Sequence, residues 1–428
     1  MTISSLTSDT PGRDSGEAQA SMLRGAQNIM RQPLHGTRVV DLTHVLAGPS
    51  CTTILADLGA EVVKIEKPGV GDLSRQVDPF RHGESYYFAG LNRNKRSVAL
   101  DLKRHGAKLV LEELVRRADV LVENFRPGML ESLDFGYQRL HELNPALVIC
   151  SISGFGQSGP LREHKSFDLV AQAMAGVMSL TGEPGRPPVR AGVPIGDILA
   201  GVYGAVAIAS ALIGRATSGR GCVIDLSMFD ALLSTLPYFA VRYLANGDIL
   251  PPVGSGDPKV VPYGAFPAAD GYIAIAVFGD DFWPPLCRAI ERPDLAADTG
   301  LSNTAGRVQR RLEVESALVE RLKTKSVAEW CDILAAAGIP HAPVLTVGAA
   351  LDHPQTHARR LIVELQHQKC GKIRTVGSPI NIDGDPVTAS ATPGPMLGEH
   401  TEQVLTELGY DAEMIARLRT QGAIASSG

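Results

Sequence analysis

Between about residues 36 and 226, short apolar runs alternate with longer amphipathic segments. Short apolar runs predict strands buried on both faces, and amphipathic segments with apolar positions three and four apart predict helices. The expected strands are residues 38–42, 61–66, 100–102, 119–123, 146–152 and 222–226. This alternation predicts an α/β fold with a Rossmann-like, doubly wound parallel sheet, which binds ligands at the carboxyl ends of its strands.

The apolar pattern changes after residue 235, so we expect a second domain. Residues 251–267 contain five prolines and three glycines, which is typical of a linker or a domain edge. A buried strand at 272–277 and helices at 282–290, 308–323 and 327–337 follow. We therefore predict a flexible tail (1–36), a large domain (37–235), a smaller α+β domain with linkers (236–344), and a return to the large domain (345–428).

Residues 198–214 form the longest apolar run of the chain, and it is rich in alanine and glycine. A membrane span needs about 20 apolar residues, so we interpret this run as a buried helix in close contact with its neighbours. The polar N-terminus lacks the apolar segment of a secretory signal.

The composition is that of an ordinary globular protein. Of its residues 44% are hydrophobic and 20% charged, and the net charge is −5, so no basic field suggests nucleic acid or an anionic membrane as a partner. The six cysteines are scattered without a CxxC pair, which argues against zinc or disulfides and favours the cytoplasm. No metal site is expected.

Asp197 stands directly before the apolar run, after a glycine in a proline-rich stretch. One interpretation is a helix N-cap, because Asp is among the preferred capping residues. The other is a nucleophile, whose carboxylate is favoured by the positive end of the helix dipole. The two roles are compatible, and the residues alone leave both open.

A strand–loop–helix–strand start also invites a dinucleotide interpretation. The fingerprint of such sites needs three glycines in the first turn, whereas residues 44–49 contain one, so an NAD(P) oxidoreductase is disfavoured. Basic residues recur near the expected strand ends and together suit the phosphates of a nucleotide-containing ligand. They are Lys67, Arg75, Lys95, Arg96, Lys103, Arg126 and Lys165.

Several motifs in fixed order resemble the class III (family III) CoA-transferases, the CaiB/BaiF superfamily that includes formyl-CoA transferase. They are Val-Val-Asp-Leu-Thr-His-Val-Leu-Ala-Gly-Pro (39–49), Gly-Ala-Glu-Val-Val-Lys-Ile-Glu-Lys-Pro (59–68), Asn-Lys-Arg-Ser (94–97), Asp-Val-Leu-Val-Glu-Asn-Phe-Arg-Pro-Gly (119–128), Gly-Phe-Gly-Gln-Ser-Gly-Pro (154–160), Gly-Asp (196–197) and Leu-Gly-Glu-His (397–400). The resemblance extends from about Gly36 to the C-terminus.

The resemblance implies a CoA-transferase that moves CoA from an acyl-CoA, such as succinyl-CoA, to a small carboxylic or dicarboxylic acid. Asp197 would be its nucleophile, CoA would be a substrate, and no cofactor would be bound permanently. The resemblance also implies an interlocked homodimer. The positions that match CoA-binding residues of the family are Val45, Leu46, Ala47, Lys67, Leu100, Lys103, Asn124, Phe125, Arg126, Lys165 and Asp168. Arg75, one of the basic residues near the strand ends, is also expected to bind CoA.

The chain departs from the family pattern at two single positions and in the glycine-rich lid of formyl-CoA transferase, for which residues 254–257 are the nearest counterpart. Formyl-CoA transferase has glutamine where Leu46 stands, and many relatives have arginine where Ser132 stands. The same superfamily contains α-methylacyl-CoA racemases, which place a histidine before the aspartate that matches Asp168. Phe167 occupies that position here and cannot exchange a proton, so a racemase-type isomerase is the second interpretation.

Overall fold

The computed structural model describes residues 32–425, which form two compact units. The first unit combines the described residues up to Ser166 with Gly196–Ala231 and the described residues from His357 onward. The second unit holds Phe167–Ile195 and Leu232–Thr356. Most of the expected N-terminal tail, residues 1–31, lies outside the described residues. The chain of the first unit is therefore interrupted twice by segments of the second.

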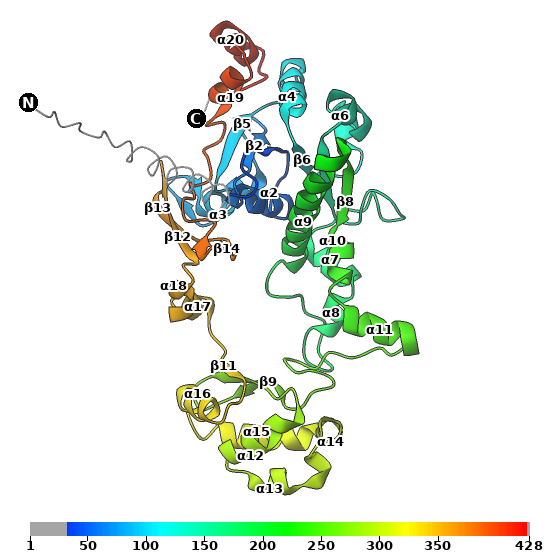
Figure 1. Ribbon diagram of the computed structural model, residues 1–428, viewed down its shortest axis with the longest axis vertical. Helices are drawn as coiled ribbons and strands as arrows, with labels where there is room; N and C mark the ends of the chain where they lie inside the picture. Colours follow the sequence, from blue (N-terminus) through cyan, green and yellow to red (C-terminus); the bar gives the residue numbers. More distant parts are fainter. Residues whose placement is uncertain (1–31, 426–428) are drawn as a thin grey trace, which may run out of the picture. The chain divides into compact units, whose positions relative to one another are not determined.

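Six parallel strands form the central sheet of the first unit (Figure 1). In chain order they are β1 (Arg38–Asp41), β2 (Glu61–Glu66), β5 (Lys95–Ala99), β6 (Val120–Glu123), β7 (Val148–Ser153) and β8 (Val223–Ser227). Their order in space is β5-β2-β1-β6-β7-β8, and every neighbouring pair is parallel. Counted along the chain, this is the 3-2-1-4-5-6 order of a doubly wound sheet, so the predicted fold class is confirmed.

Helices cover both faces of this sheet. On one face, five helices share a single apolar core with the strands: α4 (His105–Arg117), α5 (Met129–Ser132), α6 (Tyr137–Leu143), α19 (Thr401–Glu407) and α20 (Ala412–Thr420). Val110, Leu111 and Leu114 of α4 are buried in it, at the spacing of one helical face. Helix α2 (Ala47–Asp57) contacts β1, β2 and β6, and α9 (Ile195–Ser218) packs against α2.

The packing of α9 on α2 depends on glycines. A Cβ atom added to Gly204 would lie 3.0 Å from Sγ of Cys51 and 3.2 Å from Cδ1 of Ile152. Only the amino-terminal half of α9 is held this closely, and Ile213 near its other end is 75% exposed. Among the described residues, α9 is also the one helix long and apolar enough to cross a membrane. The expectation of a buried helix is therefore met on one face of α9 only.

Two local predictions need correction. The strand expected at 100–102 is instead β5, five residues earlier, because Lys95 and Ser97 find buried partners in Asp41 and Glu66 and so enter the sheet despite their polarity. The sequence of residues 229–245 predicts one continuous helix, but the structure has two helices there, α10 (Met228–Leu233) and α11 (Pro237–Asn246). Pro237 lacks an amide hydrogen, so it begins α11 and cannot continue α10.

The remaining elements of the first unit are short. They are η1 (Leu73–Gln76), β3 (Phe80–Arg81), β4 (Glu84–Ser85), α3 (Tyr86–Leu91), β12 (Ile362–His367), β13 (Gly371–Val376), β14 (Asn381–Ile382) and β15 (Asp385–Pro386). Helix α3 packs against β13 and η1.

The second unit is built on a three-stranded antiparallel sheet with the order β11-β10-β9. Trp283, Trp330 and Leu318 are fully buried in its own core. The linker expected at 251–267 ends in β9, a strand of this sheet. The elements are α7 (Asp168–Met174), α8 (Val177–Leu180), β9 (Tyr263–Pro267), β10 (Tyr272–Ala276), η2 (Asp280–Phe282), α12 (Trp283–Ala289), α13 (Pro293–Ala297), η3 (Thr299–Leu301), α14 (Thr304–Gln309), α15 (Arg311–Leu322), α16 (Val327–Ala336), β11 (His341–Pro343) and α17 (Val347–Leu351); α18 (Pro354–Ala358) returns the chain to the first unit.

Candidate active site

The predicted site segments of the first unit meet at one edge of its sheet. All six strands are parallel, so their carboxyl ends share that edge. Val45 follows β1, Lys67 follows β2, Lys103 follows β5 and Asn124 follows β6. The strand order reverses between β1 and β6, and such a reversal is where doubly wound sheets bind ligands.

The turn after β1 is fastened across this reversal. Asn124 accepts a hydrogen bond from the amide of His44 at 2.8 Å and donates one to the carbonyl oxygen of His44, also at 2.8 Å. The ring of Phe125 lies 5.5 Å from the His44 ring. The predicted CoA-binding segments at 45–47 and 124–126 are therefore brought together by direct contacts.

Buried charged side chains stabilise the same turn. The Nζ atom of Lys95 lies 3.1 Å from Oδ2 of Asp41, and Thr43 donates to Oδ1 of Asp41 through both its amide and its hydroxyl. Burial opposes the ionisation of Asp41, yet the charges of Lys95 and Lys64 outweigh it and lower the pKa of Asp41 to about 2. Burial lowers the pKa of Lys95 to about 8. Lys95 is thus an internal partner of the turn and is not exposed to ligand phosphates.

Asp197, the candidate nucleophile, is the third residue of α9 and is partly buried. It therefore lies within the first turn and does not precede the helix as an N-cap would. The positive end of the helix dipole favours its carboxylate in this position. One helical turn later, Gly201 lies against the first turn of α2, where a Cβ atom would be 3.0 Å from the carbonyl oxygen of Ala47.

Tyr87 lies near Asp197, and sequence reasoning missed it. Burial raises the pKa of the Tyr87 phenol, and the negative charges of Asp197 and Asp72 raise it further. Tyr87 is held at the start of α3, which Ser85 caps by accepting a hydrogen bond from the amide of Phe88. A tyrosine in an ordinary short helix carries no signal in the sequence that would have identified it.

The remaining candidates differ in what they offer a ligand. The side chains of Lys67, Lys103, Arg126 and Lys165 are exposed. Leu100 is 2% exposed and packs in the core, so its side chain is not available to a ligand. Asp168 belongs to the second unit, where it accepts a hydrogen bond from Gln172 at 2.7 Å.

Arg75 is already engaged within the protein. Its guanidinium donates two hydrogen bonds of 2.7 Å to Glu66 and one of 3.0 Å to the carbonyl oxygen of Pro395, and it stacks on the Phe88 ring at 3.6 Å. A phosphate would have to compete with Glu66 for these donors. A role of Arg75 in CoA binding stays a prediction.

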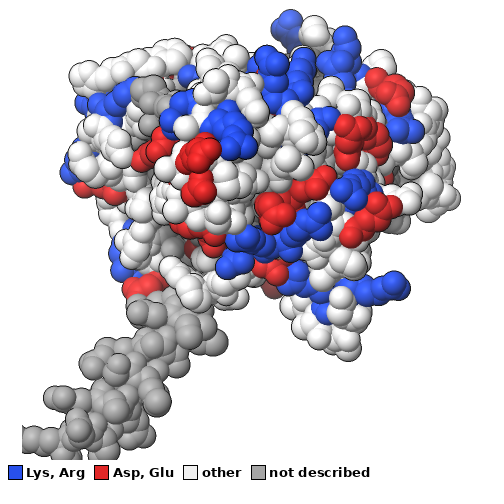
Figure 2. All heavy atoms as spheres, turned by 90° about the horizontal axis from the view of Figure 1, so that it is seen from above, with Lys and Arg blue, Asp and Glu red and all other residues white. Residues whose placement is uncertain are grey.

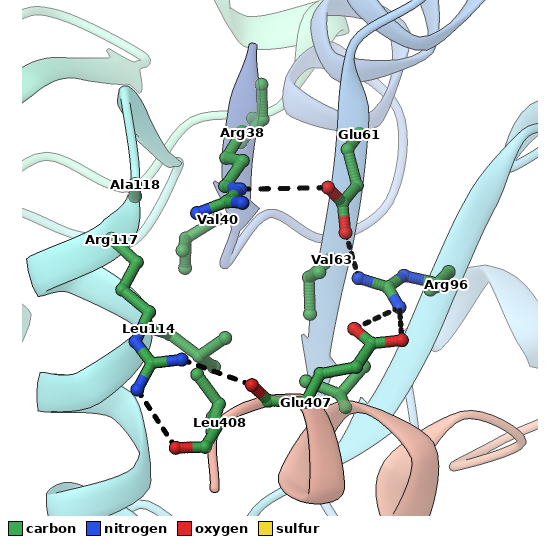
Figure 3. A pocket seen from close by; sticks show the side chains of 12 residues that line it. Arg38, Val40, Glu61, Val63, Arg96, Leu114, Arg117, Ala118, Glu407 and Leu408 are labelled. Carbon is green, nitrogen blue, oxygen red and sulfur yellow. Dashed lines mark hydrogen bonds and ion pairs between the residues drawn. The ribbon is translucent and has the colours of Figure 1, made fainter. Parts of the chain in front are cut away.

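A separate cavity of about 400 Å³ opens at the opposite edge of the sheet (Figure 3). Arg38 and Glu61 are the first residues of β1 and β2, so this cavity lies at the amino ends of the strands. Arg96 pairs there with both Glu61 and Glu407. Because its charges neutralise one another and it is far from the strand ends that carry Asn124 and Val45, we do not assign it to the reaction.

The outer charges of the molecule form no uniform field in the view of Figure 2, where basic and acidic side chains are interspersed. Many of them pair along or between helices, as Glu112 of α4 does with Arg116 and with Arg139 of α6. Within residues 32–425, no group of three or more His, Cys, Asp or Glu side chains is arranged to hold a metal ion.

Comparison with known proteins adds an independent finding. The family model described as "CoA-transferase family III" matches residues 34–401. The chain is 40% identical to the acetyl-CoA:oxalate CoA-transferase of Acetobacter aceti, over 82% of this chain and 90% of that protein. It is 34% identical to the human succinyl-CoA:glutarate CoA-transferase (92% and 90%) and 39% identical to the succinyl-CoA:mesaconate CoA-transferase of Haloarcula hispanica (88% and 96%). A CaiB/BaiF family protein from Brucella suis has a similar structure, with a TM-score of 0.80, 35% identity, and coverage of 88% of this chain and 99% of that one.

Proposed function

Because the chain belongs to family III of the CoA-transferases, we propose that it transfers CoA from succinyl-CoA to a short dicarboxylic acid with Asp197 as the nucleophile. The names of three relatives contain the dicarboxylic acids oxalate, glutarate and mesaconate, and two of the three contain succinyl-CoA. Neither substrate remains on the enzyme as a cofactor.

The reaction proceeds by exchange at the Asp197 carboxyl group. Its carboxylate attacks the thioester carbonyl, which forms a mixed anhydride and releases CoA thiolate. The thiolate attacks the aspartyl carbonyl and releases the donor acid, leaving an aspartyl–CoA thioester. The acceptor carboxylate attacks this thioester, which forms a second anhydride and releases CoA thiolate again. The thiolate then attacks the acceptor carbonyl, which gives the new acyl-CoA and regenerates free Asp197. Water must be excluded, because it would hydrolyse these intermediates.

The observation that carries this proposal is the placement of Asp197. It lies in the first turn of the helix that packs, through Gly201, on the turn after β1. The turn after β1 also contacts Asn124 and Phe125, at the point where the strand order reverses. A carboxylate thus lies beside the edge where a nucleotide-containing ligand is expected.

The exposed cations at this edge suit the phosphates of CoA. Lys67 and Lys103 follow the neighbouring strands β2 and β5, and Arg126 follows β6. Their side chains are exposed and form no ion pair within the described residues, so they remain available to a ligand. Phosphate groups bind well to such side chains.

A second copy of the chain is the proposed partner of α9. Ile198, Val202 and Val206 follow one another at intervals of four, Ile213 comes seven residues later, and all four are exposed. This spacing places them on one stripe of the helix, and an exposed apolar stripe is typical of a protein interface.

All six cysteines are free thiols, which supports the cytoplasm as location.

Mass spectrometry after incubation with succinyl-CoA alone tests the proposal. The peptide that contains Asp197 should carry the mass of a succinyl or a CoA adduct. Asp197→Ala should lose the adduct and lower kcat by about 1,000-fold or more. Asp134→Asn, a change at an exposed carboxylate, is the matched control and should keep both. The proposal fails if Asp197 never carries an adduct and Asp197→Ala keeps its turnover.

A further inference from the structure

Val45, in the turn after β1, has an unusual backbone conformation. Its φ angle is +68°, in the left-handed region that β-branched residues rarely adopt. A non-glycine residue in this region is strained and persists only when its surroundings hold it there. The Val45 side chain is 36% exposed, so packing of that side chain does not explain its conformation.

The buried ion pair between Lys64 and Asp72 holds this turn through two hydrogen bonds. Oδ1 of Asp72 accepts a hydrogen bond from the Val45 amide at 3.0 Å, and Oδ2 of Asp72 pairs with Nζ of Lys64 at 2.9 Å. Lys64 donates a second bond, of 2.7 Å, to the carbonyl oxygen of Thr43. The side chains of Lys64 and Asp72 are 0% exposed. The conformation of the turn is therefore fixed from inside the protein.

Asp72 is itself held firmly. Its amide donates to Oε2 of Glu66 at 3.0 Å, and its Oδ1 atom also accepts from the amide of Ser74 at 2.8 Å. Burial opposes the ionisation of Asp72, but Lys64 and these hydrogen bonds lower its pKa well below the usual range. Asp72 therefore remains a charged acceptor for the Val45 amide under all ordinary conditions.

The turn Val45–Ala47 lies beside the proposed nucleophile, Asp197. Ala47, two residues after Val45, contacts Gly201 of the helix that carries Asp197. The charges of Asp72 and Asp197 both raise the pKa of Tyr87, so both carboxylates lie within electrostatic range of one phenol. A change in the backbone of Val45 would therefore move atoms that border the reaction.

We propose that Asp72, held by Lys64, is a positioning residue for CoA transfer. Asp72 is too deeply buried to touch a substrate, and it acts by keeping Val45 left-handed and the turn Val45–Ala47 in its catalytic shape. This inference rests on the proposed function at Asp197. Stability alone does not account for the pair, since a buried ion pair is often replaced by apolar residues at little cost in folding free energy.

Two double variants separate positioning from stability. Lys64→Met/Asp72→Asn and Lys64→Met/Asp72→Leu both remove the buried charges, and they differ in whether residue 72 has an oxygen that accepts from the Val45 amide. Displacement of an active-site segment by about 1 Å can cost about 100-fold in rate. We expect kcat of the leucine variant to lie about 10- to 100-fold below that of the asparagine variant, with KM for succinyl-CoA within about threefold.

Glycine at position 45 supplies the decisive readout. Glycine adopts positive φ angles without support, so Val45→Gly added to Lys64→Met/Asp72→Leu should restore kcat by about fivefold or more. A residue with only a structural role would give no such recovery. If the leucine variant does not fold, Lys64→Met/Asp72→Ala replaces it, because alanine removes the acceptor without adding volume.

The inference is overturned if the two double variants, with equal melting temperatures, have equal kcat values, or if glycine brings no recovery. Its failure is distinguishable from that of the proposed function. The mass of the Asp197 peptide in the wild-type protein decides whether an aspartyl intermediate forms, whereas the ratio of kcat values among the variants decides whether Asp72 positions the turn.

Discussion

Gly201 of α9 lies directly against Ala47 of α2: a Cβ atom on Gly201 would be 3.0 Å from the Ala47 carbonyl oxygen and 2.8 Å from Cβ of Ser50. The missing side chain lets the two helices approach each other closely. That approach brings Asp197, four residues before Gly201, beside the turn that follows β1. The geometry of the proposed active site thus depends on the absence of one methyl group.

Gly201→Ala should therefore destabilise the protein and lower its activity. The new methyl group would meet backbone atoms that cannot move away, and overpacking of this kind costs about 1–3 kcal/mol. Gly214→Ala on the same helix is the control, because its Cβ atom would meet nothing within 4 Å and alanine favours helix by about 1 kcal/mol. Thermal unfolding and kcat are measured for both variants. Equal melting temperatures of Gly201→Ala and wild type would contradict the prediction.

Asp41 should make the stability of the first unit depend on pH in the acid range. Its pKa falls from the ordinary 3.8 to about 2 on folding, so its charge stabilises the fold above about pH 4 and this contribution is lost as the pH falls toward 2. The contribution is about 2 kcal/mol. Urea unfolding followed by circular dichroism gives the free energy of unfolding of wild type and of Asp41→Asn. The difference between the two should shrink by that amount between pH 5 and pH 2, a range that includes both pKa values.

Asn124→Ala should weaken the binding of acyl-CoA. The substitution removes both hydrogen bonds to the backbone of His44, each with a net contribution of about 1 kcal/mol, and so frees the turn after β1. KM for succinyl-CoA should rise, with a smaller loss of stability. Asn124→Asp keeps the acceptor for the His44 amide and loses the donor, so its KM should lie between those of wild type and Asn124→Ala. Unchanged KM in both variants would contradict a role for this contact.

Lys103 and Arg75 should behave differently although both are basic residues near the same edge. Lys103→Met removes an exposed charge and should raise KM for acyl-CoA about fivefold, less so at high salt, without changing the melting temperature. Arg75→Met leaves Glu66 buried and unpaired and should cost about 3 kcal/mol in stability. Steady-state kinetics at two salt concentrations and thermal unfolding distinguish them. A stable Arg75→Met variant with raised KM would show that Arg75 contacts the ligand.

The sequence was sufficient for the fold class and the family, because both depend on features that are local in the chain. Apolar runs such as 61–66 and 146–152 predict a buried parallel sheet, and the strand order confirms it. The resemblance to class III CoA-transferases is confirmed by the family match over residues 34–401. The roles of Asp197 and of the CoA-binding residues remain predictions.

Buried charges were the main obstacle to prediction. Lys95 and Lys64 resemble surface residues in the sequence, yet their side chains are fully buried, because Asp41 neutralises Lys95 and Asp72 neutralises Lys64. The same partners explain why Lys95 begins a strand that its polarity would not predict. The left-handed Val45 has no sequence signal either, since the acceptor that holds it is 27 residues away.

The division of the first unit into three stretches of chain has a consequence for synthesis on the ribosome. Val404, Leu405, Ile415 and Leu418 complete its main core, and Glu407 neutralises Arg96, but all of them come from the last stretch to be made. Until that stretch emerges, the nascent chain carries an uncovered apolar face, and Arg96 has only Glu61 as its ionic partner. We therefore expect the incomplete chain to be prone to aggregation until its end has been made.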